Sequence, residues 1–147
     1  MYAQSAVASP PELTSSASEL RIVLGQLVRR LRAENRMSIS QATVLARLDR
    51  DGPATASHLA AAERVRPQSM AQTIVELETG GLVSRTPDET DRRQILVDLT
   101  EQGRAMLADD RARRDGWLAQ AIETQLAADE QELLAKAIAL LGRIASN

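Results

Sequence analysis

Residues 67–100 of this 147-residue chain read PQSMAQTIVELETGGLVSRTPDETDRRQILVDLT. In the first half of this stretch, Met70, Ile74 and Leu77 recur at helical spacing behind Pro67, a favoured first residue of a helix. Two consecutive glycines follow and stop the pattern. We therefore predict a helix that begins at Pro67, turns its apolar stripe inward and ends at the glycine pair.

The second half of the stretch changes from a helical period to a period of two, which is typical of strands. We predict strands over 82–86 and 94–99, with the polar, turn-rich residues 87–93 between them. In the second strand one face is apolar, and we expect it to be buried: Ile95, Val97 and Leu99. The stretch as a whole therefore predicts a helix followed by a hairpin with a protruding, charged loop.

The residues before this stretch predict a tail and a long first helix. Residues 1–12 mix Ser, Ala and Pro without a period, so we expect a flexible tail there. Ser16 and Glu19 match the S-x-x-E capping box, and apolar residues follow at helical spacing. The first helix is therefore expected within residues 13–36.

Two shorter helices are predicted next. Ser38 and Gln41 form a second capping pattern, and the sequence Asp-Gly-Pro at 51–53 stops the helix that they begin. Thr55 can cap a third helix, which ends around Arg64. Together with the helix and hairpin that follow, these helices have the order of a winged helix-turn-helix.

Two helices are also predicted after the hairpin. Thr100 can cap a long fifth helix that ends near Leu126, and Asp129 with Glu132 begins a sixth. The apolar arc of the sixth helix is wider than one domain needs, which indicates a partner surface. We expect a single, mainly α domain with a small β-hairpin wing: residues 13–36 and 101–147 form dimerisation helices, and 38–100 form the DNA-binding lobe.

The composition excludes several classes of protein. The chain has no cysteine, which removes disulfides, thiolate metal sites and cysteine redox switches, and it has one His, His58, without a companion at metal-ligand spacing. We find no nucleophile with a base, no phosphate-binding glycine loop and no membrane or export segment. We therefore expect a cytoplasmic protein that is not an enzyme and that binds no cofactor or metal.

The outward face of the helix after Pro67 is rich in uncharged hydrogen-bonding groups rather than in Lys, Arg and Glu. The amide of Gln can bond both the donor and the acceptor edge of adenine, and Ser and Thr can bond several bases. The candidates for contact in the major groove of DNA are Pro67, Gln68, Ser69, Gln72 and Thr73. The alternative is that this face is merely a polar surface.

The hairpin loop supplies Arg92 and Arg93, which could reach a minor groove, where the negative potential attracts arginine. For Asp91 we favour a structural role in orienting an arginine. Arg85 could meet either a phosphate or a carboxylate. Further candidates for phosphate contact lie near predicted helix starts, where backbone N–H groups are free: Thr55, Ser57 and Arg66.

The charge of the lobe complicates this interpretation. The whole chain has a formal charge of −2, and residues 38–99 contain seven Arg against nine Asp and Glu. DNA binding would therefore depend on a few well-placed arginines and on the avidity of a dimer. The alternative is a helical protein-interaction module, for example an antirepressor that kept the fold and lost DNA binding.

The stretch from Ala56 to Gly103 resembles the MarR family of bacterial regulators. The resemblance rests on four motifs, in this order and with these gaps: RPQSM at 66–70, LETGGLVSR at 77–85, DETDRR at 88–93 and LTEQG at 99–103. It implies a triangular homodimer built from the first, fifth and sixth helices, and a helix after Pro67 that enters the major groove. It also implies that Arg93 enters the minor groove.

The same resemblance implies a repressor that releases a pseudo-palindromic duplex when a small, often aromatic or phenolic ligand enters a crevice between the dimerisation helices and the DNA-binding lobe. Trp117 is the only aromatic side chain in the predicted helical part and is therefore the candidate for lining this crevice. The alternative, which we favour from the residues alone, is that Trp117 packs in the core or in the dimer.

Overall fold

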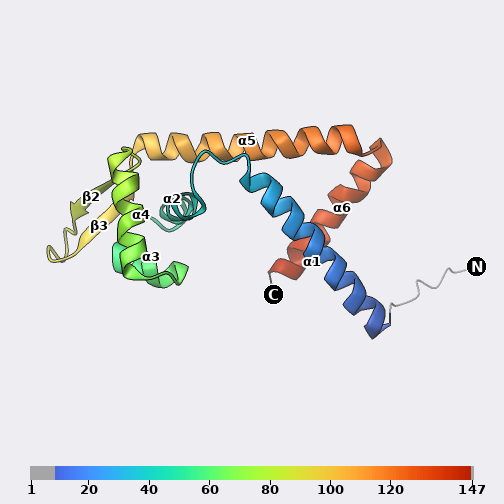
Figure 1. Cartoon of the computed structure of the whole chain (residues 1–147), viewed down its shortest axis with the longest axis horizontal. Helices are drawn as coiled ribbons and strands as arrows, with labels where there is room; N and C mark the ends of the chain where they lie inside the picture. Colours follow the sequence, from blue (N-terminus) through green and yellow to red (C-terminus); the bar gives the residue numbers. More distant parts are fainter. Residues whose placement is uncertain (1–8, 147) are drawn as a thin grey trace, which may run out of the picture.

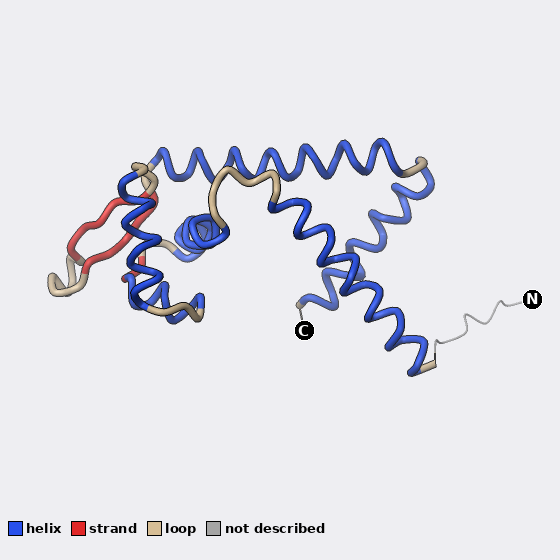
Figure 2. Tube along the Cα trace, in the orientation of Figure 1, coloured by secondary structure: helices blue, strands red, loops and turns tan. Residues whose placement is uncertain are grey.

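The computed structural model describes residues 9–146 as a helical molecule with one small sheet (Figures 1 and 2). The helices are α1 (Pro10–Arg32), α2 (Ile39–Asp51), α3 (Ala56–Glu63), α4 (Pro67–Thr79), α5 (Glu101–Gln125) and α6 (Ala128–Ala145), and the strands are β1 (Ala54–Thr55), β2 (Val83–Pro87) and β3 (Ile95–Leu99). In Figure 1, α5 runs from a lobe formed by α2, α3, α4 and the sheet toward a pair of crossing helices, α1 and α6. The predicted fold class, mainly α with a β-hairpin wing, is confirmed.

The beginning of α1 differs from the prediction. The helix starts at Pro10, and Ser9 is its N-cap, so residues 10–12 are helical rather than part of a tail. The carboxylate of Glu12 accepts hydrogen bonds from the backbone N–H and the hydroxyl of Ser9, at 2.6 and 2.8 Å. The S-x-x-E pattern at Ser16 therefore lies inside a helix that is already formed. Residues 1–8, the rest of the predicted tail, lie outside the described residues.

Three predicted helix starts are confirmed by their caps. The hydroxyl of Ser38 accepts from the backbone N–H of Gln41 at 3.2 Å, that of Thr55 from His58 at 3.2 Å, and that of Thr100 from Gly103 at 3.0 Å. For α6 the start is shifted from the predicted Asp129, because the carboxylate of Glu130 accepts from the backbone N–H of Ala127 at 2.8 Å.

The sheet has three antiparallel strands in the order β1-β3-β2. The hairpin of β2 and β3 was predicted, whereas β1, which pairs Ala54 with Val97, was not. Val97 and Leu99 are buried as predicted, but Ile95 is 53% exposed. Figure 1 shows that the hairpin extends beyond the helices of the lobe, so among the described residues no helix packs on its outer end.

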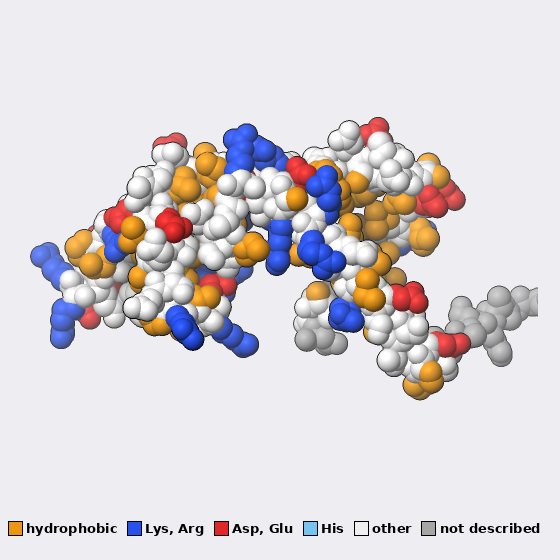
Figure 3. Space-filling model, in the orientation of Figure 1, with side chains coloured by type: hydrophobic (Ala, Val, Ile, Leu, Met, Phe, Trp, Pro, Cys, Tyr) orange, Lys and Arg blue, Asp and Glu red, His pale blue; other side chains and the backbone are white. Residues whose placement is uncertain are grey.

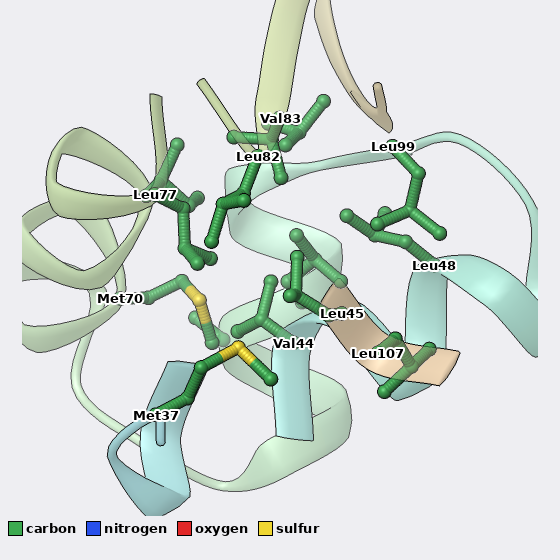
Figure 4. Packing of buried hydrophobic residues seen from close by; sticks show 14 residues of the cluster. Met37, Val44, Leu45, Leu48, Met70, Leu77, Leu82, Val83, Leu99 and Leu107 are labelled. Atoms are coloured by element: carbon green, nitrogen blue, oxygen red, sulfur yellow. The ribbon is translucent and has the colours of Figure 1, made fainter. Parts of the chain in front are cut away.

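One apolar cluster holds the lobe together, and it includes side chains from every element of the lobe (Figure 4). Leu45 of α2, Leu59 of α3 and Leu77 of α4 are essentially inaccessible. Leu107 of α5 joins this cluster, so the long helix is anchored in the lobe. The cluster fixes the orientation of α4 relative to the hairpin, which is what positions the candidate site.

The two terminal helices, α1 and α6, differ from the helices of the lobe, because neither of them contains a buried residue. Most of their large apolar side chains are exposed, and Figure 3 shows such side chains along this part of the molecule. They are Leu13, Ile22, Val23, Leu24, Leu27 and Val28 on α1 and Leu133, Ile138, Leu140 and Ile144 on α6. Within residues 9–146, no helix combines the length and apolarity needed to cross a bilayer.

Candidate nucleic-acid interface

The helix α4 presents the two faces that its sequence predicts. Met70, Ile74 and Leu77 are buried in the lobe. On the opposite side, Pro67, Gln68, Ser69 and Gln72 are exposed. Thr73 differs from the prediction: it is half-buried, and its hydroxyl donates to the carbonyl of Ser69 at 3.0 Å. The exposed polar face therefore contains two amides and one free hydroxyl, with Thr73 at its edge.

Gln72 is also held by a neighbour on the same face. Its Nε2 donates to Oε1 of Glu76, one turn further along α4, at 3.1 Å. Oε2 of Glu76 accepts from Nε2 of Gln41 on α2 at 3.2 Å. Sequence reasoning assigned Gln41 only to helix capping, because nothing in the sequence shows that α2 and α4 lie side by side.

The end of the wing is organised by two aspartates. Asp88 Oδ1 accepts from the backbone N–H of Thr90 at 3.0 Å, and Asp91 Oδ1 accepts from that of Arg93 at 3.1 Å. Nε of Arg93 also lies 3.5 Å from Asp91 Oδ1. The Arg93 side chain is nevertheless 95% exposed, and Arg92 is exposed beside it. Figure 3 shows basic side chains at this end of the molecule.

A hollow of about 370 Å³ lies between the start of α3, α4 and the wing, and we refer to it as the wing hollow. It brings together Thr55, Ser57, Arg85 and Arg93, four residues that sequence reasoning proposed separately. All four have partners in the chain: the hydroxyl of Thr55 caps α3 and lies 3.1 Å from that of Ser57, Nε of Arg85 lies 2.9 Å from Oε2 of Glu78, and Arg93 contacts Asp91. For Arg85 the structure thus shows a carboxylate partner.

Several of the acidic side chains of the lobe are held in ion pairs. Asp49 contacts Arg111 of α5, Asp51 contacts Arg47 and Arg50, and Glu63 contacts Arg47. Among the seven arginines of the lobe, three form no ion pair within residues 9–146: Arg64, Arg66 and Arg92. Arg66 is the N-cap residue of α4, and Arg64 has a positive φ of 54° in the turn before it. Sequence reasoning did not select Arg64, because the turn that exposes it depends on an unusual backbone conformation.

A second hollow, of about 220 Å³, lies between the end of α1, α2 and α5, and we refer to it as the arginine crevice. Its lining includes Arg32, Asn35, Asp110, Arg111 and Arg114. Asp110 is only 1% exposed, and its Oδ1 accepts from the backbone N–H of Arg36 at 3.3 Å. Oδ2 of Asp110 and Oδ1 of Asn35 are buried and find no donor among the described residues.

Trp117, the sequence-based candidate for a ligand crevice, is not among the residues that line the arginine crevice. Trp117 is half-buried, and the guanidinium carbon of Arg30 on α1 lies 4.9 Å from the centroid of its ring. That distance is typical of a cation–π contact, so Trp117 links α5 to α1. Asp110, which sequence reasoning missed, is one acidic residue among several on α5, and only its burial distinguishes it.

His58 lies on the exposed side of α3. Its backbone N–H donates to the cap of α3. No group of three or more His, Asp or Glu side chains with the geometry of a metal site occurs among residues 9–146.

The exposed polar helix α4, packed on α2 and α3 and followed by an arginine-tipped hairpin, defines a winged helix-turn-helix protein. Comparison with known proteins agrees with this class. The model of the MarR family matches residues 37–95. An HTH-type transcriptional regulator from Mycobacterium tuberculosis (strain CDC 1551 / Oshkosh) is 38% identical over 128 residues, which cover 85% of this chain and 89% of the relative.

Solved structures show the same fold over nearly the whole chain. A protein from Pseudomonas aeruginosa PA01 has a TM-score of 0.81 and 39% identity, covering 95% of this chain and 99% of that one. A variant of MepR from S. aureus, bound to an oligodeoxyribonucleotide, has a TM-score of 0.69 and 18% identity, covering 88% and 97%. The chain belongs to the MarR family and is a DNA-binding transcriptional regulator of the helix-turn-helix type, not an enzyme.

Proposed function

We propose that this regulator is a homodimeric, cytoplasmic repressor that binds a pseudo-palindromic duplex and releases it when a small molecule enters the arginine crevice. The observation that carries the DNA-binding part is the exposed polar face of α4 beside an arginine-tipped wing. Because a B-DNA major groove admits one α-helix, α4 can enter it while the wing reaches the adjacent minor groove. A structural relative with this fold is bound to an oligodeoxyribonucleotide, which supports DNA binding in general.

In this arrangement Gln68, Ser69 and Gln72 read base edges, and Pro67 and Thr73 offer apolar contact at the margins of the reading face. Arg92 and Arg93 enter the minor groove, and Asp91 orients Arg93 through the backbone and side-chain contacts described above. Residues around the wing hollow and the start of α4 contact phosphates, which set the position of the protein on the duplex. They are Thr55, Ser57, Arg64, Arg66 and Arg85.

The homodimer is supported by the apolar side chains that α1 and α6 leave exposed. Together with Leu13, Leu20 and Leu24, Ile144 lines a largely apolar hollow of about 450 Å³ between these two helices. Soluble monomers rarely leave contiguous apolar surface of this kind uncovered, and a second copy of α1 and α6 would cover it. A two-fold dimer would place its two α4 helices on half-sites about 10 bp apart, or a small multiple of that.

The small-molecule part is supported by the chemistry of the arginine crevice. Arg32, Arg111 and Arg114 suit a carboxylate or a phenolate. A small aromatic acid matches this requirement. Because the crevice separates α2 of the lobe from α1 and α5, an occupant would alter how the lobe is held.

The test is fluorescence anisotropy on duplexes selected from genomic DNA, compared with random duplex at moderate salt. We expect a clear preference for the selected duplex that weakens as salt is raised. Replacing Arg93→Ala should weaken binding to every duplex and lower the salt slope by about one. Arg29→Ala removes the same charge from α1 and should leave binding unchanged.

Two outcomes would contradict the proposal. If no duplex is preferred over random DNA, the chain is better explained as a helical protein-interaction module, the alternative that its acidic balance favours. If Arg93→Ala binds every duplex as tightly as the unchanged protein does, the wing does not contact DNA.

A further inference from the structure

Glu76 is an acidic residue on the polar face of α4 that is proposed to meet DNA. It is exposed on α4, one turn after Gln72, where its charge would lie close to phosphates and repel them. Its two carboxylate oxygens are both occupied: Oε1 accepts from Gln72 at 3.1 Å and Oε2 accepts from Gln41 at 3.2 Å. The carboxylate therefore connects α2 to the polar face of α4.

The direction of the Gln41 amide is fixed by α2 itself. Its Oε1 accepts from the backbone N–H of Ser38 at 3.3 Å, as part of the capping box, so its Nε2 is the end that is directed at Glu76. An ionised carboxylate can only accept hydrogen bonds. Any amide that meets Glu76 must therefore present its nitrogen, and Gln72 does so.

This contact determines which atoms of Gln72 remain for DNA. The amide nitrogen of Gln72 has two hydrogens, and one of them forms the hydrogen bond to Glu76. The second hydrogen and Oε1 stay free, and together they form the donor and acceptor pair that matches N7 and N6 of adenine. An amide held in this orientation loses less rotational freedom on binding than one that turns freely.

We propose that Glu76 is a positioning residue that presents the amide of Gln72 for an adenine in the major groove. Its charge lowers affinity for every duplex, while the fixed amide raises discrimination at one base pair in each half-site. The inference rests on the proposed function, because it requires α4 to lie in the major groove.

The test replaces each adenine of the selected duplex in turn by 7-deazaadenine, which lacks the N7 acceptor. With the unchanged protein, one position per half-site should lose about fivefold in affinity, the effect of one hydrogen bond. In Glu76→Ala the loss at that position should shrink toward zero, while binding to random duplex becomes tighter.

Two further variants distinguish the positioning of Gln72 by Glu76 from a general effect of charge and from a loss of folding. Gln41→Glu keeps an acceptor for the Ser38 N–H but has no donor for Glu76, so it should reduce the 7-deazaadenine penalty without loosening the start of α2. Glu89→Ala removes an exposed acid from the wing, and it should tighten binding to every duplex while leaving the penalty intact.

The possible failures are distinguishable. If the unchanged protein prefers a selected duplex but shows no penalty at any adenine, or if Glu76→Ala keeps the full penalty, the inference is wrong and the proposed function stands. If Glu76→Ala instead loses its preference at a cytosine, Glu76 reads that base directly and is not a positioning residue. If the unchanged protein prefers no duplex, the proposed function and this inference fail together.

Discussion

The start of α1 is stabilised by hydrogen bonds to the carboxylate of Glu12, and the charge of this group depends on pH. The hydrogen bond from the Ser9 backbone N–H, with a second from its hydroxyl, holds the pKa of the Glu12 carboxyl below its ordinary value. A carboxyl whose pKa is lower in the folded chain stabilises the fold above the pKa of the unfolded chain. That stabilisation is lost as the pH falls through the folded-state pKa.

An NMR titration of the carboxyl groups checks this prediction. The Glu12 signal should titrate at a lower pH than the ordinary value of a glutamate carboxyl. In Ser9→Ala the pKa of Glu12 should rise, because the hydroxyl donor is lost while the backbone donor remains. A Glu12 midpoint at the ordinary value of a glutamate, unchanged in Ser9→Ala, would show that the contact with Ser9 does not persist in solution.

At the scale of single elements, the contact between α5 and the sheet depends on a residue without a side chain. Gly103 is buried in the first turns of α5, and a Cβ there would lie 2.0 Å from the carbonyl oxygen of Leu82. That contact is with backbone, so it cannot be relieved by rotating a side chain. The close approach sets where α5 leaves the wing and how α5 carries Leu107 into the core.

We therefore expect Gly103→Ala to destabilise the protein by about 2–4 kcal/mol, because α5 or the sheet must move. Gly116→Ala is the matched control on the same helix, since a Cβ at Gly116 would meet nothing within 4 Å. It should stabilise by about 0.5–1 kcal/mol through helix propensity. Urea unfolding measures both changes, and equal effects of the two variants would contradict the packing seen here.

The surface that we propose contacts DNA is built by several helices and strands together, not by single residues. Gln41 of α2 and Glu76 of α4 are 35 positions apart, and Thr55 and Arg93 are still further apart, yet each pair lies together. The spacing within α4 predicted which side chains face outward. It could not predict that α2 would supply a partner for that face, because the packing of α2 against α4 is decided by the buried cluster.

At the scale of the whole molecule, α5 separates the DNA-binding lobe from the exposed apolar faces of α1 and α6 (Figure 1). A helix of 25 residues is about 37 Å long at the usual rise of 1.5 Å per residue. The predicted dimer contact therefore lies far from α4, and the two functions can be separated by mutation.

We expect the double substitution of Leu133→Glu and Ile144→Glu to yield monomers by analytical ultracentrifugation, because both side chains are 66% exposed in the single chain and would be buried in the dimer. The monomer should lose most of its affinity for a full site, since the avidity of two linked lobes is lost. Binding to an isolated half-site should remain unchanged. Glu132→Lys, an exposed polar position of α6, is the control.

A different result would assign these helices another role. If the unchanged chain is monomeric at micromolar concentration, or if the double variant remains dimeric, the apolar faces of α1 and α6 do not form the dimer contact. Loss of half-site binding in the double variant would indicate that it had disturbed the lobe itself.

The ends of most helices could be predicted from the sequence, because they depend on interactions between residues that are close together in the chain. The capping side chains of α2, α3 and α5 act on backbone groups three residues away, and glycine or proline limits α2 and α4, so these signals need no tertiary context. The same locality explains the error at α1. Two S-x-x-E patterns occur there, and once the earlier one starts a helix, propagation through the later one is favourable.

The tertiary structure alone decided the contacts between distant residues. Pairing of β1 with β3, the carboxylate partner of Arg85, the burial of Asp110 and the position of Trp117 outside the arginine crevice all depend on which helices pack together. That packing is driven by burial of apolar surface, which is not directional and leaves no local pattern at the polar residues that it brings together. The sequence therefore predicted the exposed polar face of α4, and the folded chain determined which side chains support it.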